Sequence, residues 1–120
     1  MSVQPGTLNL TLQRRADYSL LLEFFIDDQP WDLTGYNVIA QIYNEGRTLK
    51  YADFTVTNVS LATGKVRIGL ADTVTATLPL SIRGTLGSVY WDVMLQDATG
   101  FRAYYVEGLI FVSEGYSAPP

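Results

Sequence analysis

The sequence predicts an all-β sandwich. Apolar and polar residues alternate with a period of two along most of the chain, as they do in half-buried strands. Clusters of Gly, Asp, Asn and Pro interrupt this alternation about every eight to twelve residues, which is the spacing of turns in sandwiches and barrels. Helical periodicity is nearly absent. With 120 residues, 48% of them hydrophobic, the chain can bury one core, so we expect one domain.

The first two predicted strands cover residues 7–13 and 17–26. One face of the first strand carries Leu8, Leu10 and Leu12. The predicted core face of the second strand carries Tyr18, Leu20, Leu22, Phe24 and Ile26. Leu21 and Phe25 lie on the opposite face, so the second strand is apolar on both sides.

A turn at residues 27–30 leads to the third strand, at residues 36–44. We expect Trp31 and Leu33 to close one end of the core where the second and third strands meet. The fourth and fifth strands, at residues 51–59 and 65–70, form a predicted hairpin around Gly64.

Residues 71–79 predict a short helical turn, with Asp72 as its N-cap and Pro79 as its stop. The sixth and seventh strands, at residues 88–96 and 101–112, are joined by a tight turn. Seven strands of this length, mostly in antiparallel succession, predict an antiparallel immunoglobulin-like β-sandwich of about seven strands with one short helical turn. We expect a domain at residues 7–112, flanked by arms at 1–6 and 113–120.

Composition argues against several classes of function. Eight basic against 12 acidic residues give a net charge of −4, which disfavours binding to nucleic acid. Because His and Cys are absent, the usual zinc sites and catalytic dyads have no members. Asp27, Asp28 and Asp32 form the nearest approach to an acidic cluster, which we interpret as a solvated turn. The sequence predicts no enzyme activity, no cofactor, no metal site and no membrane segment.

Asp92 and Glu107 are unusual because each lies inside a strongly apolar strand. The hairpin that joins these strands brings the two carboxylates together as near-diagonal neighbours on one face. They are either a solvent-facing pair or part of an interface at which a neighbouring chain supplies an arginine.

Aromatic residues make up 12% of the chain, more than the two inner faces of a small sandwich accommodate. The outward face of the second, sixth and seventh strands, together with the C-terminal arm, therefore predicts a protein-binding surface. Its candidate residues are Leu21, Phe25, Tyr90, Met94, Tyr105, Leu109 and Tyr116.

Three segments in order resemble a known kind of domain. The first is Arg14-Arg15-Ala16-Asp17-Tyr18, and the second runs from Trp31-Asp32-Leu33-Thr34-Gly35-Tyr36 into Ala40-Gln41-Ile42. The third combines Thr63-Gly64-Lys65-Val66, Leu70-Ala71-Asp72-Thr73 and Tyr90-Trp91-Asp92-Val93. This order is similar to that in small β-sandwich domains of tailed-bacteriophage particles, such as the N-terminal domain of baseplate upper proteins.

The resemblance implies a structural protein of the virion, assembled in the host cytoplasm. Its expected partners are other virion proteins and copies of itself, with no nucleic acid or membrane. Its position in the particle stays open among tail, baseplate, fibre attachment and head decoration. The alternative is a free-standing adhesion or carbohydrate-binding module, which would gather its aromatic residues in one shallow groove. An assembly protein would instead spread apolar contacts over several surfaces.

Overall fold

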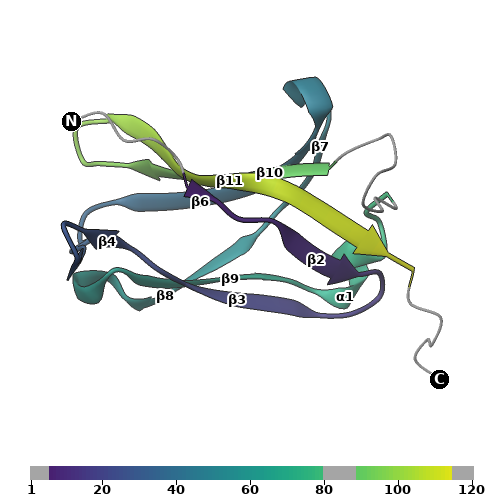
Figure 1. Ribbon diagram of the computed structural model, residues 1–120, viewed down its shortest axis with the longest axis horizontal. Coiled ribbons are helices and arrows are strands. Elements are labelled where there is room, and N and C mark those ends of the chain that lie inside the picture. The colour runs from purple at the N-terminus through teal and green to yellow at the C-terminus, as the bar shows by residue number, and fades with distance from the viewer. Residues whose placement is uncertain (1–5, 80–88, 115–120) are drawn as a thin grey trace.

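The computed structural model describes residues 6–79 and 89–114, and these residues form two packed layers of β-strands (Figure 1). The larger sheet contains six strands: β1 (Gly6–Thr7), β2 (Leu10–Gln13), β6 (Asn37–Asn44), β7 (Lys50–Asp53), β10 (Val89–Gln96) and β11 (Arg102–Ser113). The smaller sheet contains three: β3 (Tyr18–Glu23), β8 (Thr55–Ser60) and β9 (Lys65–Leu70). The remaining elements are the hairpin β4 (Phe25–Ile26) and β5 (Gln29–Pro30), the 3₁₀ turns η1 (Glu45–Arg47) and η2 (Leu61–Thr63), and helix α1 (Asp72–Thr75).

The core lies between the two sheets and follows the alternation of the sequence. Along β10, every second residue from Val89 to Leu95 is buried. Leu22 of β3 and Ile68 of β9 face these residues from the smaller sheet, and both are buried. The inward faces predicted for the central strands are therefore confirmed.

The strand order is that of an immunoglobulin-like sandwich. The smaller sheet has the order β3-β9-β8, which corresponds to strands B, E and D. In the larger sheet, β11, β10 and β6 correspond to G, F and C, and β7 takes the place of C′ beside C. The predicted all-β, immunoglobulin-like sandwich with one short helix is confirmed.

Pairing differs from the purely antiparallel prediction at one edge. β1 and β2 run parallel to β11, with Gly6 beside Val106 and Leu10 beside Ile110. This edge makes the larger sheet mixed. The predicted strand 7–13 also breaks at Leu8 and Asn9, so Leu8 is exposed although Leu10 and Leu12 are buried.

The predicted strand at residues 51–59 is wrong, because the chain changes sheets at Phe54. β7 pairs with β6 in the larger sheet, whereas β8 pairs with β9 in the smaller one. Phe54 is buried at the crossing, and its ring packs against Trp91 with 5.8 Å between centroids. At the domain ends, Gly6 and Ser113 lie in strands although both were assigned to arms. Glu114, also assigned to an arm, is described as well and is bound by two arginines. The remaining arm residues, 1–5 and 115–120, and Ser88 lie outside the described residues.

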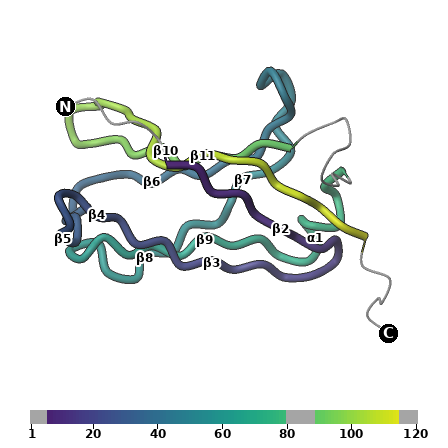
Figure 2. Tube along the Cα trace, viewed as in Figure 1, coloured from purple at the N-terminus to yellow at the C-terminus, as the bar shows by residue number. Residues whose placement is uncertain are grey.

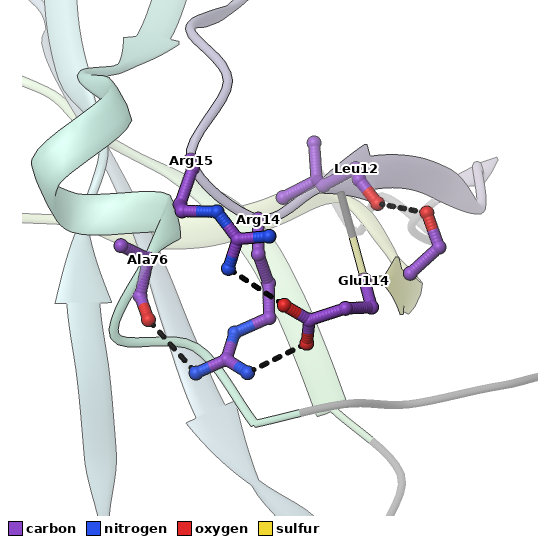
Figure 3. Close-up of polar contacts among 6 residues, drawn as sticks. Leu12, Arg14, Arg15, Ala76 and Glu114 are labelled. Atoms are coloured by element: carbon purple, nitrogen blue, oxygen red, sulfur yellow. Dashed lines mark hydrogen bonds and ion pairs between the residues drawn. The ribbon is translucent and has the colours of Figure 1, made fainter. Parts of the chain in front are cut away.

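The connection from β2 to β3 is fixed by two arginines that share one carboxylate (Figure 3). Arg14 and Arg15 donate to the two oxygens of Glu114 at 2.9 and 2.6 Å. Arg14 also donates to the carbonyl of Ala76, just after α1. These contacts lower the pKa of Glu114, because both guanidinium groups stabilise its ionised form. The Arg-Arg segment thus joins the end of β11 to the helical turn.

Candidate functional site

The outward face of the larger sheet carries rows of side chains in register across β6, β10 and β11. One row is Tyr43, Tyr90 and Leu109. The next row is Gln41, Asp92 and Glu107. The third row is Ile39, Met94 and Tyr104. An aromatic and aliphatic surface is therefore crossed by one polar row with two carboxylates.

A groove of about 610 Å³ opens over the first two rows. One wall is the turn between β6 and β7, where Asn44 accepts a hydrogen bond from the amide of Leu49 at 2.8 Å and donates to Thr48. The other wall is the end of β1 and the link to β2, including Thr7 and Asn9. The groove lies between two chain segments far apart in sequence.

The second wall is tied to the sheet from below. The indole N–H of Trp91 donates to the carbonyl of Leu8 at 2.8 Å, and Asn9 accepts from the amide of Leu109 at 2.9 Å. Gly108 lies directly beneath this crossing, and a Cβ there would collide with the backbone of Leu8. Glycine at position 108 lets the two backbones approach.

Asp92 and Glu107 are directly opposed on β10 and β11, closer than the near-diagonal arrangement expected. Burial raises the pKa of Asp92, the nearby Arg47 guanidinium lowers it, and the Glu107 carboxylate raises it again, with burial the largest effect. Within residues 6–79 and 89–114, neither carboxylate accepts a hydrogen bond or forms an ion pair. Asp92 is half-buried in the groove and Glu107 is exposed, and the described part of the chain leaves the acceptor sites of both open.

Arg47 sits at the mouth of the groove in the β6–β7 turn. Its guanidinium carbon lies 4.7 Å from the centre of the Tyr43 ring, within the range of a cation–π contact. Among the groove residues, this single guanidinium faces three carboxylates: Glu45, Asp92 and Glu107. The groove is therefore acidic as well as aromatic.

The structure brings only part of the predicted interface together. Tyr90, Met94 and Leu109 share the outward face of the larger sheet, as predicted. Leu21 is exposed on the smaller sheet, and Phe25 is 57% exposed in the β4–β5 hairpin. Tyr116 lies outside the described residues.

The outward position predicted for Tyr105 is wrong. Val93 pairs with Val106 and Met94 pairs with Tyr104, so Tyr105 is an extra residue in a β-bulge. Its ring packs toward the core, 4.7 Å from the Trp31 ring centre. Burial raises its pKa, with a smaller contribution from Tyr36.

Trp31, Tyr36 and Tyr105 form an aromatic cluster that closes one end of the sandwich. The β4–β5 hairpin and the β10–β11 turn lie at that end (Figure 2). Leu33 is fully buried there, and Trp31 is partly buried against Tyr36 and Tyr105. These positions agree with the predicted closing role of Trp31 and Leu33.

Sequence reasoning missed Gln41, Tyr43, Arg47 and Asn9 as members of the groove. The alternation in β6 placed Tyr43 opposite Ala40 and Ile42, which was the available signal for its outward position. The approach of Asn9 and Arg47 depends on long-range pairing and turn geometry. No local pattern encodes it.

Among the described residues, no group of three potential metal-binding side chains gathers. Within the same ranges, no helix is long and apolar enough to cross a bilayer. Asp32 lies in the loop after β5, where hydrogen bonding from the Thr34 side chain, and then from the Thr34 amide, lowers its pKa. It is a turn residue.

The strand order defines an immunoglobulin-like sandwich, with a groove on the outward face of its larger sheet. No protein-family model and no curated protein sequence matches the chain. Among solved structures, it is similar to a chain in the crystal structure of ICOS in complex with ICOS-L and an anti-ICOS-L VNAR domain, with 11% identity and a TM-score of 0.47. That match covers 91% of this chain, which spans 56% of the matched one. The fold assignment rests on the strand order and not on this likeness.

Proposed function

We propose that this protein is a structural component of a tailed-bacteriophage particle and acts through protein–protein contacts without catalysis. The observation that carries the proposal is the distribution of exposed apolar side chains over several separate surfaces. These side chains are Leu8, Leu21, Phe25, Leu49, Val59, Tyr90, Phe101 and Tyr104.

The surfaces belong to different parts of the sandwich. Phe25 and Phe101 occupy two hairpins at one end, with exposed fractions of 57% and 61%. Leu49 lies in the turn between β6 and β7, and Val59 lies in β8. A single exposed apolar side chain is ordinary on a soluble protein, but large ones on several surfaces, beside the contiguous apolar rows of the larger sheet, are what a subunit covered by several neighbours would carry.

Mass spectrometry of purified particles of the source phage tests this proposal. The protein should co-purify with intact tailed particles at several copies per particle. Phe25→Asp should fold normally by circular dichroism but enter particles poorly. Thr57→Asp, a change at an exposed polar position on the smaller sheet, is the control and should be incorporated. Absence of the wild-type protein from purified intact particles would overturn the virion assignment.

A second candidate function is that of a free-standing carbohydrate-binding module. The observation in its favour is that Tyr43 and Tyr90 share one groove with carboxylates and the amide side chains of Asn9 and Gln41. Such groups stack on sugar rings and hydrogen-bond to their hydroxyls. Nuclear magnetic resonance titration with methyl glycosides of common hexoses tests it, and an unchanged spectrum contradicts it.

A further inference from the structure

We infer that the groove on the larger sheet receives an arginine side chain of a partner protein. This inference rests on the proposed function, because it gives the chemistry of one protein–protein contact.

The first argument is charge complementarity. Three carboxylates face one guanidinium in the groove, and Asp92 and Glu107 stand side by side on its floor. Like charges in directly opposed positions of a sheet repel each other. A cation placed between them would remove this repulsion. Burial is the main cause of the raised pKa of Asp92; Arg47 lowers this pKa, and the Glu107 carboxylate raises it as the smallest of the three effects.

The second argument is the shape of the charged groups. A guanidinium is planar and can donate to two carboxylates at once, whereas an ammonium is a compact point charge. The carboxylates of Asp92 and Glu107 come from adjacent strands in one row, so their oxygens border a common space. Their acceptor sites are free of hydrogen bonds from residues 6–79 and 89–114.

The third argument is that the aromatic part of the groove already binds a guanidinium. Arg47 of the same chain stacks over Tyr43. Tyr90 lies in register beside Tyr43 and is 37% exposed, with no ring or cation contact among the described residues. An incoming arginine would thus find a free aromatic face next to the carboxylate pair.

The direct test is a titration of the isotope-labelled, full-length protein with two blocked pentapeptides, Gly-Thr-Arg-Thr-Gly and its citrulline counterpart. Citrulline has nearly the shape of arginine but no charge. We expect amide shifts at Tyr90, Asp92 and Glu107, with a dissociation constant on the order of 1 mM for so short a peptide. The citrulline peptide should bind at least about tenfold more weakly. Added salt should weaken the arginine peptide.

Isosteric variants connect the binding to the carboxylates. Asp92→Asn combined with Glu107→Gln should abolish the shifts while leaving the circular dichroism spectrum unchanged. Glu107→Gln alone should weaken binding, which provides a readout if the double variant folds poorly. Glu23→Gln, an exposed carboxylate on the smaller sheet, is the matched control and should bind as the wild type does.

Three outcomes would overturn the inference: equal binding of both peptides, unchanged binding by the double variant, or shifts outside the groove. Shifts with methyl glycosides but not with the arginine peptide would also overturn it and would favour the carbohydrate-binding module. Co-purification with particles is measured separately. Failure of arginine binding therefore leaves the virion proposal standing on its own result.

Discussion

The two outward faces of the sandwich differ in chemistry although they cover the same core. On the larger sheet, the outward rows contain Tyr43, Tyr90, Leu109, Met94 and Tyr104. On the smaller sheet, the outward residues are mostly polar: Ser19, Glu23, Thr55, Thr57, Lys65 and Arg67, with Leu21 and Val59 as apolar exceptions. Burial of one core explains the inward residues of both sheets. It does not explain an aromatic outward face, and this difference is the basis of the proposed protein–protein contacts.

The largest expected effect on the free energy of unfolding distinguishes Trp91, on the inward side of β10, from Tyr90, on its outward side. Trp91 is 2% exposed, packs on Phe54 and holds Leu8. Trp91→Ala should lower the free energy of unfolding by about 3 to 5 kcal/mol, because it leaves a cavity and an unpaired carbonyl. Tyr90→Ala, one residue away, should cost less than about 1 kcal/mol. Denaturant titration measures both, and equal losses would contradict the assigned faces.

A smaller effect tests the bulge in β11. Tyr105→Ala should cost about 2 kcal/mol, less than a fully buried aromatic, because Tyr105 packs on Phe24 and Trp31 but remains partly exposed. Tyr104→Ala should change stability by no more than about 0.5 kcal/mol, since its side chain is on the outward face. The reverse order in thermal or chemical unfolding would place the bulge elsewhere.

The smallest expected effect concerns Asp92 and pH. Its pKa is raised above the ordinary value of 3.8 in the folded protein, mainly by burial. The contribution of Asp92 to the free energy of unfolding is therefore most favourable below pH 3.8, where its carboxyl is protonated. This contribution is lost as the pH rises through the raised pKa. Asp92→Asn should gain stability relative to the wild type over that rise, by at most about 1 kcal/mol because solvent still screens the carboxylate. A difference in unfolding free energy between Asp92→Asn and the wild type that stays constant with pH would contradict this.

The alternation of the sequence was sufficient to predict the core. Leu22, Phe24, Ala40, Ile42 and Val93 are buried where the period of two places them. Burial on one side of a sheet strongly constrains the register, so a local pattern carries this information.

The features that could not be predicted depend on single-residue irregularities. The bulge at Tyr105 exchanges the faces of two adjacent tyrosines, which an alternation pattern cannot distinguish. The change of sheet at Phe54 has no glycine or proline to mark it. Tyr43 and Arg47 reach the groove through long-range strand pairing and turn geometry. The sequence therefore predicted Tyr90 and Leu109 as members of this surface but not Tyr43 or Arg47.

The parallel pairing of β1 and β2 with β11 has a mechanical consequence. Gly6 lies beside Val106, and Gln13 lies beside Ser113. Tension applied at Gly6 and Glu114 therefore acts along these strands and loads their hydrogen bonds in shear, all at once. Tension applied at Thr55 and Leu70 would instead unzip the β8–β9 hairpin one pair at a time. Single-molecule pulling should give a higher rupture force in the first geometry, which suits a subunit that carries load along its own length.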